Sequence, residues 1–337
     1  MKNIAIIHDS YLHVGGAEKV LKYFVSAYPK ADIYIPLLKK KYSGETKTTG
    51  RIYTSILSEL PFVEKYASIL KPLVLLYWET LNLKKYDLII SSSHSFSSKS
   101  VNKSKHAKHV SYIHTPPKYL YSELNEMNWI KKLPFSVLFW PLFFLLRKYD
   151  YYSAQKPDLL IANSKNVQSR IKKYYNRNSI VIYPPHTVAP VDFKKRKGKY
   201  YLFFSRLEKQ KGAELVIRTC SQYKLPLVVI GTGSQEKYLK KIASKNIEFT
   251  GFITEEEKVL IFAEAKALLY AAIDEDYGLV IPEVLSYGIP VIAYDSGSIR
   301  EIQSKQTSKN EILLFSEYNC SSLVHAIHEH KKIYKDI

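Results

Sequence analysis

Two glutamates are the side chains of this sequence that are best placed for chemistry. Glu275 and Glu283 lie eight residues apart in a segment that reads as a strand, a loop with Gly278, and a helix over about 280–287. A helix that starts after a glycine turn exposes its first backbone N–H groups, which favour an anion. Ionised carboxylates accept hydrogen bonds from vicinal hydroxyls. The segment therefore predicts a site for a ligand with anionic and hydroxyl groups.

The elements that must hold this site alternate regularly along the chain. Short apolar runs of strand length are separated by longer segments with helical periodicity, which is typical of parallel sheets covered by helices. The predicted strands are 4–8, 31–35, 88–91, 109–113, 159–162, 200–205, 227–230, 247–250, 267–271, 291–293 and 312–315. We therefore expect an α/β fold of two doubly wound, Rossmann-like units.

A proline-containing stretch at 181–190 separates the two sets of strands. Prolines cannot donate to a sheet ladder, so neither sheet is expected to continue through it. The predicted domains are 1–185 and 186–337. Two such domains facing each other would leave a cleft at the carboxyl ends of their strands, where ligands of these folds bind.

Composition limits the possible functions. The chain has 337 residues, 46% of them hydrophobic and 24% charged, which is a globular composition. The net charge is +19, and residues 1–185 alone carry +16. Such a basic half attracts a polyanion: nucleic acid, an anionic membrane or a phosphorylated substrate.

Two further features concern the compartment. Two cysteines cannot build a disulfide framework or a cysteine-rich zinc site, which favours a reducing compartment. The most apolar stretch, 133–146, is too short to span a bilayer, and the apolar run at the N-terminus is too short for a signal peptide. We therefore expect neither a transmembrane helix nor a signal peptide.

The Glu-x7-Glu pair, together with Gly278, Pro282 and Gly288, resembles the retaining family 4 glycosyltransferases of the GT-B fold. That resemblance implies that Glu275 contacts the transferred sugar and that Glu283 binds the nucleotide ribose. It also implies a donor bound without a metal ion or other cofactor. The nearby Asp-x-Asp at 274–276 resembles a metal motif of the other large glycosyltransferase fold, but we expect these carboxylates to cap the helix.

A second segment supports the same resemblance. Arg206 and Lys211 have the spacing of the arginine and lysine that grip the donor diphosphate in that family. Two cations there would neutralise the charge on a departing nucleoside diphosphate. The resemblance further implies that donor-binding backbone is supplied by Gly15, Gly16, Gly231, Gly233, Gly278, Leu279 and Val280.

The segment around His114 points to a narrower group. His114-Thr-Pro closely resembles a segment of bacterial mannosyltransferases and rhamnosyltransferases of surface-polysaccharide synthesis. By that resemblance His114 faces the reacting sugar and steers the acceptor. We take His94 and Lys118 as further candidates of lower rank.

The expected reaction is retaining transfer of a hexose from GDP-mannose or a UDP-hexose to a lipid-linked or oligosaccharide acceptor of a growing surface polysaccharide. We expect a cytoplasmic protein, peripheral on the inner face of the membrane, with no nucleic-acid partner. Lys131, Lys132, Arg147 and Lys148 flank an apolar stretch that fits an anionic membrane surface. The last helix is expected over 321–335. Either this helix crosses back to the first domain, as the last helix does in relatives, or the chain has no such crossing.

Two alternatives remain open from sequence. A sugar-nucleotide epimerase or a sugar-phosphate synthase uses the same fold, and fold does not settle function. A nucleic-acid-binding protein would use the basic half, although no helix-turn-helix, ribonucleoprotein-type strand or zinc-finger spacing is recognisable.

Overall fold

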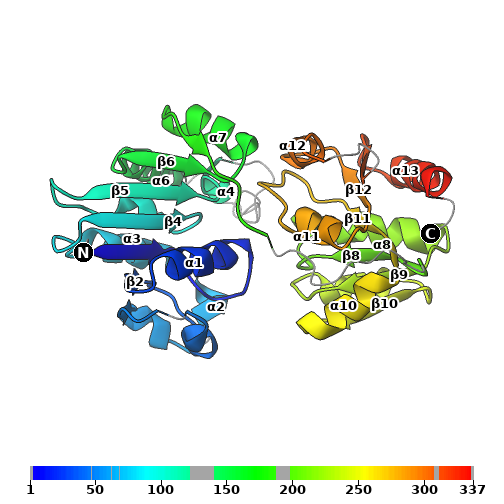
Figure 1. Cartoon of the computed structure of the whole chain (residues 1–337), viewed down its shortest axis with the longest axis horizontal. Helices are drawn as coiled ribbons and strands as arrows, with labels where there is room; N and C mark the ends of the chain where they lie inside the picture. The colour runs from blue at the N-terminus through cyan, green and yellow to red at the C-terminus, as the bar shows by residue number, and fades with distance from the viewer. Residues whose placement is uncertain are drawn as a thin grey trace. The chain divides into compact units, whose positions relative to one another are not determined.

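The computed structural model describes residues 3–46, 48–61, 63–67, 69–121, 140–186, 198–306 and 311–334. The chain divides into two compact units, Met1–Pro185 and His186–Ile337, which are described separately (Figure 1). Lys131 and Lys132 of the expected membrane segment lie outside the described residues.

The first domain is built on a parallel sheet that has seven strands within the described residues. Its strands, in spatial order, are β3 (Ile52–Tyr53), β2 (Asp32–Tyr34), β1 (Ile4–His8), β4 (Leu88–Ser93), β5 (Lys108–Ile113), β6 (Leu159–Ala162) and β7 (Ile180–Val181). The order reverses at β1, which has β2 on one side and β4 on the other. In such sheets the carboxyl ends next to this reversal form the usual ligand site.

Helices cover both faces of this sheet. They are α1 (Gly16–Ala27), α2 (Val63–Tyr66), α3 (Lys71–Thr80), α4 (Lys118–Tyr121), α6 (Trp140–Ser153) and α7 (Lys165–Tyr175), with 3-10 turns at Lys40–Glu45, Ile56–Glu59 and Ser98–Ser100. Successive residues of β1 point to opposite faces. Ile6 therefore packs with Leu21 of α1, while Ile7 packs with Trp78 of α3. Figure 1 shows α1 lying across β1.

The second domain repeats this design with six parallel strands in the described part. Their spatial order is β10 (Ile247–Gly251), β9 (Leu227–Ile230), β8 (Tyr200–Phe204), β11 (Ala265–Tyr270), β12 (Val291–Tyr294) and β13 (Ile312–Phe315). The helices are α8 (Ala213–Gln222), α9 (Glu236–Ile242), α10 (Glu255–Ala263), α11 (Val280–Ser286), α12 (Ile299–Gln303) and α13 (Cys320–Ile333), with a 3-10 turn at Lys209–Lys211.

The last helix packs within its own domain. Leu323 and Ile327 of α13 lie in the same apolar core as Val216 of α8 and Phe203 of β8. The described part of α13 therefore packs its buried face into the core of the second domain.

Every strand predicted from the sequence is present, with ends shifted by at most two residues. The two-residue edge strands β3 and β7 were missed, because two residues show no periodicity. Val181 of β7 also shows that the linker begins slightly later than predicted, and Pro184 and Pro185 follow directly. No helix among the described residues has the length and apolarity needed to cross a bilayer.

Candidate active site

In the second domain, Lys211 and Glu275 meet at the carboxyl end of the sheet. The Lys211 ammonium lies 2.7 Å from Glu275 Oε2, and the Tyr270 hydroxyl donates to the same oxygen at 2.6 Å. Burial and the neighbouring Glu275 raise the pKa of Tyr270 well above 10, so its hydroxyl remains a donor. Lys211 and Tyr270 thus hold one carboxylate oxygen of Glu275 in a fixed place.

Glycines make room for this cluster. Gly278 has φ +78°, and a Cβ there would lie 3.2 Å from Glu275 Cγ and 3.3 Å from the Tyr270 hydroxyl. A Cβ at Gly297 would lie 2.2 Å from the Glu275 carbonyl oxygen. The Ile273 amide donates to the Gln210 carbonyl at 2.9 Å, which joins the Glu275 loop to the segment that carries Lys211.

A second pair of loops surrounds Arg206. Gly231 has φ +130°, and a Cβ there would lie 2.0 Å from the Ser205 carbonyl oxygen; a Cβ at Gly233 would lie 2.5 Å from that of Leu207. Only glycine allows this close backbone approach. Between them Arg206 is exposed and forms no ion pair with another described residue. Its guanidinium is accessible to an anion.

Glu283 lies apart from this cluster in a buried ion pair that the sequence did not reveal. On α11 its side chain is 3% exposed, and the Lys258 ammonium on α10 lies 2.7 Å from Glu283 Oε1. Lys258 also contacts Glu255. Burial alone would lower the pKa of Lys258, but the two glutamates raise it, so the lysine is charged. No motif marks Lys258, because its role depends on α10 packing beside α11.

In the first domain, His114 is connected to two other strands through Ser92. Its Nε2 lies 2.8 Å from Ser92 Oγ, which in turn lies 2.9 Å from His8 Nδ1. The Asn163 amide donates to the His114 carbonyl at 2.9 Å and holds the end of β5. Burial lowers the pKa of His114 well below 6.5, so the imidazole is neutral. A neutral imidazole suits hydrogen bonding to a sugar hydroxyl.

His94, the histidine of lower rank among the predicted candidates, lies near His8 and His114. Its ring centroid is 6.1 Å from that of His114 and 6.2 Å from that of His8. The Asp9 carboxylate accepts backbone N–H groups from His94, Phe96 and Ser98, each at 2.7 Å. Burial alone would raise the pKa of Asp9, but His94 and these donors lower it to about 2.

The glycine loop of the first domain brings an acidic residue to the same group. Gly15 precedes α1 and Gly16 begins it, and a Cβ on Gly15 would lie 3.0 Å from Glu18 Oε2. Glu18 Oε1 lies 3.8 Å from His8 Nε2. The sequence analysis did not select His8, Asp9 or Glu18. His8 ends β1, Asp9 directly follows it, and Glu18 lies in the first turn of α1. Lys118 begins α4.

Metal-ligand geometry occurs at one place in the described part of the chain. One ligand atom each from His8, Glu18 and His94 lie within 4.8 Å of one another. The aspartates at 274 and 276 belong to no such group of three among the described residues. The helix that follows, α11, has Leu279 at its N-cap and no side-chain cap, so the expected capping by these aspartates is wrong.

The comparisons with known proteins address the whole chain. A family model described as "Glycosyl transferases group 1" matches residues 188–333, and one described as "Glycosyltransferase Family 4" matches residues 14–188. The chain is a family 4 glycosyltransferase. Its two parallel sheets and their flanking helices form the GT-B fold.

Curated relatives of this glycosyltransferase include proteins of polysaccharide and glycan synthesis. The "Uncharacterized 41.2 kDa protein in cps region" of Klebsiella pneumoniae is 26% identical over 70% of this chain and 68% of that protein. The alpha-1,3/1,6-mannosyltransferase ALG2 of Kluyveromyces lactis is 22% identical over 88% of this chain and 70% of its own. The O-antigen chain mannosyltransferase C of Escherichia coli is 22% identical over 42% of this chain and 43% of its own.

A solved structure with the same fold is that of Anabaena HepE with UDP and glucose. It has a TM-score of 0.67 and 18% identity, covering 98% of this glycosyltransferase and 89% of HepE. At this identity the likeness shows the fold alone.

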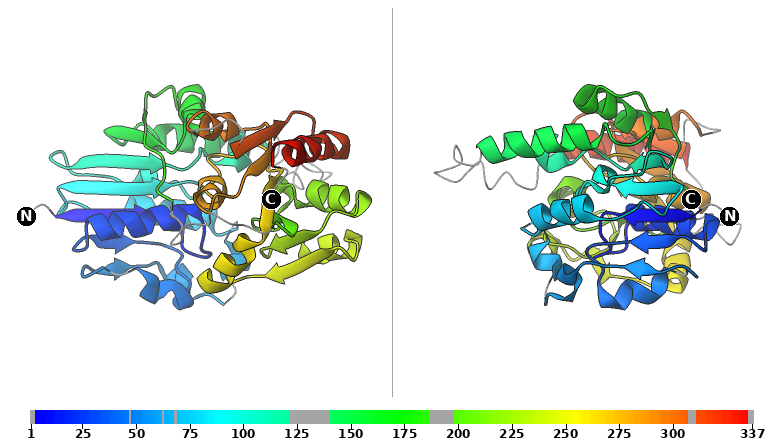
Figure 2. Two further views of the ribbon diagram at one scale, coloured as in Figure 1. Left: turned by 45° about the vertical axis from the view of Figure 1, so that its right-hand side comes forward. Right: turned by 90° about the vertical axis from the view of Figure 1, so that its left-hand side faces the viewer.

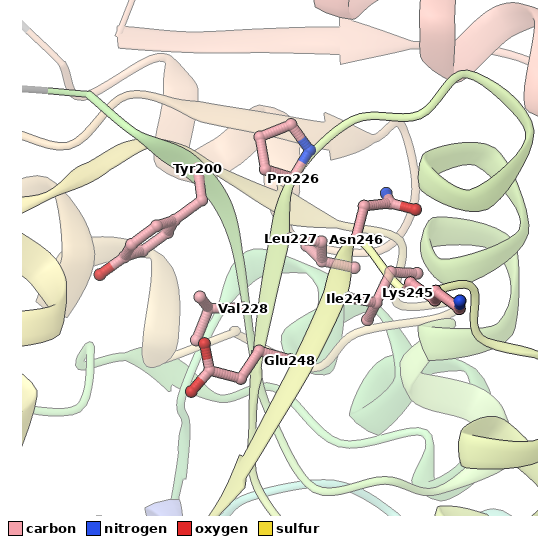
Figure 3. Close-up of a pocket in the computed structure, with 8 residues that line it drawn as sticks. All are labelled: Tyr200, Pro226, Leu227, Val228, Lys245, Asn246, Ile247 and Glu248. Carbon is pink, nitrogen blue, oxygen red and sulfur yellow. The ribbon is translucent and has the colours of Figure 1, made fainter.

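A surface hollow of about 420 Å³ in the second domain lies away from the predicted site. Its lining comes from the amino-terminal ends of β8, β9 and β10 and includes Tyr200, Leu227 and Ile247 (Figure 3). The predicted residues Arg206 and Gly231 follow the carboxyl ends of these strands. Ligands of parallel α/β sheets bind at carboxyl ends, so we assign no donor-binding role to the hollow.

Proposed function

We propose that this glycosyltransferase moves a hexose from a nucleotide sugar to a lipid-linked or oligosaccharide acceptor of a surface polysaccharide, with retention of anomeric configuration. The observation that carries the proposal is the cluster of Lys211, Glu275 and Tyr270, together with the exposed Arg206, which like Lys211 follows the carboxyl end of β8. It places two cations and a fixed carboxylate in one domain. A nucleoside diphosphate and a sugar hydroxyl are the groups that such residues bind.

In this proposal Arg206 and Lys211 bind the donor diphosphate. An ammonium has three N–H donors, so Lys211 can hold Glu275 and still donate to a phosphate oxygen. Both cations stabilise the charge that develops on the departing nucleoside diphosphate, which supplies most of the rate enhancement. Backbone N–H groups of the Gly231–Gly233 turn and of Leu279 and Val280 add neutral donors.

The two glutamates bind the hydroxyl-bearing parts of the donor. Glu275 accepts from a hydroxyl of the transferred sugar, and Glu283 accepts from the ribose hydroxyls. Lys258 positions Glu283 through their 2.7 Å contact. In this scheme the acceptor oxygen bonds to the anomeric carbon on the face from which the nucleoside diphosphate leaves, so no protein nucleophile is required. A phosphate oxygen of the departing diphosphate takes the acceptor proton, so no protein general base is required either.

The first domain supplies the acceptor side of the reaction. The neutral imidazole of His114 binds a sugar hydroxyl, and the loop at Gly15 and Gly16 approaches the donor phosphates. GDP-mannose is the preferred donor in this proposal, because curated relatives are named as mannosyltransferases. A UDP-hexose is the second choice, since HepE is similar in fold and has been solved with UDP-glucose.

A lipid-linked acceptor requires a membrane surface, and two neighbouring helices of the first domain offer one. Leu73 and Leu76 on α3 and Leu145 on α6 are between 51% and 61% exposed. The right-hand view of Figure 2 shows the N-terminal part of α6, in bright green, extending beyond the sheet of its domain. We propose that these leucines, with the surrounding positive charge of residues 1–185, rest on the anionic inner face of the membrane.

Nucleotide-dependent thermal stability tests the donor assignment. Wild type, Arg206→Ala and Glu283→Ala are heated with GDP, UDP, ADP and their sugar conjugates in EDTA, and each shift is taken from that variant's own Tm. A ligand at a hundredfold excess over its Kd adds about 2.7 kcal/mol of stability. We expect one nucleotide family to stabilise the wild type and to lose its effect in both variants.

Arg218→Ala is the matched control, because this exposed arginine on α8 pairs with Glu214 and lies outside the proposed site. It should keep the full nucleotide shift. No shift with any nucleotide, beside strong salt-dependent binding to random DNA, would overturn the proposal in favour of a nucleic-acid-binding protein. Turnover of a nucleotide sugar without an acceptor product would favour an epimerase.

A further inference from the structure

Three potential metal ligands converge at the carboxyl edge of the first-domain sheet. His8 ends β1, His94 directly follows β4, and Glu18 lies in the first turn of α1. One ligand atom from each lies within 4.8 Å of the other two, and His8 Nε2 is 3.8 Å from Glu18 Oε1. In the described part of the chain, no other three such side chains come together in this way.

Two imidazole nitrogens in this group have no hydrogen-bond partner in the described part of the chain. The Nε2 atoms of His8 and His94 are both buried and make no hydrogen bond there. Leaving a buried polar atom without a partner is unfavourable and calls for an explanation such as a bound ion. His109 Nδ1 also lacks a hydrogen-bond partner among the described residues, but His109 belongs to no described group with a carboxylate ligand.

The opposite nitrogen of each ring faces an oxygen that would orient it. His8 Nδ1 lies 2.9 Å from Ser92 Oγ, and His94 Nδ1 lies 3.8 Å from Asp9 Oδ2. Histidine ligands of metals usually make a hydrogen bond with their second ring nitrogen. His8 does so with Ser92, whereas the 3.8 Å contact of His94 with the Asp9 carboxylate is longer than a hydrogen bond. These contacts leave Nε2 of each ring to bind the ion.

The charges of the pocket also favour a cation. Asp9 and Glu18 are 0% and 9% exposed, and in the described part of the chain their ion-pair partners are histidines, not lysine or arginine. Buried carboxylates are normally balanced by a paired cation or a metal. The pocket is therefore locally acidic within a domain whose net charge is +16.

We propose that His8, Glu18 and His94 bind a divalent transition-metal ion of the zinc class. Two imidazoles and one carboxylate form a known three-residue zinc set that keeps a fourth position open. Bonds of about 2.0–2.1 Å place tetrahedral ligand atoms about 3.4 Å apart. The three ligand atoms, which lie within 4.8 Å of one another, would therefore move closer together when the ion binds. All three ligands belong to the first domain, whereas the metal-free donor site is proposed on residues of the second.

The metal would also influence His114 without touching it. Ser92 bonds both His8 and His114, so fixing the His8 ring fixes one partner of the Ser92 hydroxyl. The open metal position would then take water or a hydroxyl of the acceptor. Asp9 is a positioning residue in this arrangement, because it holds His94 and not the ion.

Metal binding by the full chain tests the proposal directly. The protein, without a histidine tag, is stripped with EDTA, dialysed and titrated with ZnCl₂, and bound zinc is counted by elemental analysis. We expect one zinc per chain in the wild type, and affinity lower by about a hundredfold or more in His8→Gln and His94→Gln. Co²⁺ should give the visible absorption of a tetrahedral site in the wild type and not in His8→Gln or His94→Gln.

His109→Gln is the matched control, because His109 is a buried imidazole bonded to Ser91 outside the group. It should bind zinc as the wild type does. Circular dichroism and the nucleotide shift of the second domain verify that each variant is folded. The proposal would be overturned by equal zinc affinity in the wild type and His94→Gln, or by the absence of stoichiometric zinc. It would also be overturned if free sugars, but not zinc, raised the thermal stability of the protein, because the pocket would then bind sugar hydroxyls and not a metal.

Discussion

The two domains share a fold but place different chemistry at the carboxyl ends of their sheets. The second domain presents charged pairs, Lys211 with Glu275 and Lys258 with Glu283. The first presents imidazoles joined through a serine hydroxyl, with burial lowering the pKa of His114 and so keeping it neutral. Charged groups suit a nucleoside diphosphate, and neutral ones suit sugar hydroxyls. The difference fits the proposed division of work, with the donor bound by the second domain and the acceptor by the first.

The two sites also differ in how the chain assembles them. Glu275 and Glu283 belong to one strand, turn and helix, so a local motif contains both. His8 and Ser92 are 84 residues apart, and Ser92 and His114 are 22 apart. Only parallel pairing of β1, β4 and β5 brings these together.

The largest effect on stability is expected at the Lys258–Glu283 pair. Lys258→Met leaves the Glu283 carboxylate buried without its lysine, and breaking a buried ion pair costs about 3–5 kcal/mol. The free energy of unfolding should fall by about 3 kcal/mol, mainly in the second domain. Urea unfolding with hydrogen exchange on peptides of each domain measures this.

Lys240→Met is the control for that experiment. Lys240 forms an exposed pair with Glu236 on α9 at the same 2.7 Å distance. Exposed pairs of this kind contribute about 0.3–0.5 kcal/mol. If Lys258→Met lowers the free energy of unfolding as little as Lys240→Met does, the Lys258–Glu283 ion pair does not stabilise the fold. The contrast between the domains would then lose this support.

A smaller effect on stability, with a clear effect on transfer, is expected at Gly278. Gly278 and Gly288 both have positive φ, +78° and +68°, so alanine at either costs about 1–2 kcal/mol. Only at Gly278 would the new methyl group meet Glu275 and Tyr270; at Gly288 nothing lies within 4 Å. Gly278→Ala should lower kcat/KM about tenfold or more, whereas Gly288→Ala should stay within about twofold of the wild type. Equal activities would contradict the placement of Glu275 at the donor sugar.

The sequence predicted the fold because each long strand and each boundary has a local signal. Apolar runs marked the strands, and prolines marked the end of the first domain. The donor-side residues were selected for the same reason, since they lie in short motifs. Lys258, Asp9 and Glu18 were missed, because a residue on one element gains its role only when another element packs beside it. The structure adds those pairings, which no spacing along the chain encodes.

The smallest effect is expected at the proposed membrane surface of the first domain. Leu76→Ser and Leu145→Ser replace leucines that are 60% and 61% exposed on α3 and α6. The two helices are joined by the Tyr149 hydroxyl, which donates to Glu79 at 3.0 Å. Because the leucines are exposed, the double variant should change the free energy of unfolding by no more than about 0.5 kcal/mol. Its affinity for anionic lipid vesicles should fall about tenfold, as expected when apolar side chains no longer enter the lipid interface.

Leu260→Ser on α10 of the second domain is the control, since Leu260 is 71% exposed but lies in the less basic half of the chain. Vesicle co-sedimentation of the three proteins at low and physiological salt compares the two domains directly. Leucines on the first domain should matter for binding and Leu260 should not, and added salt should weaken binding because the charge on residues 1–185 contributes to it. Vesicle binding that is unchanged in the α3–α6 variant, or lost equally in Leu260→Ser, would contradict a membrane role specific to the acceptor-side domain.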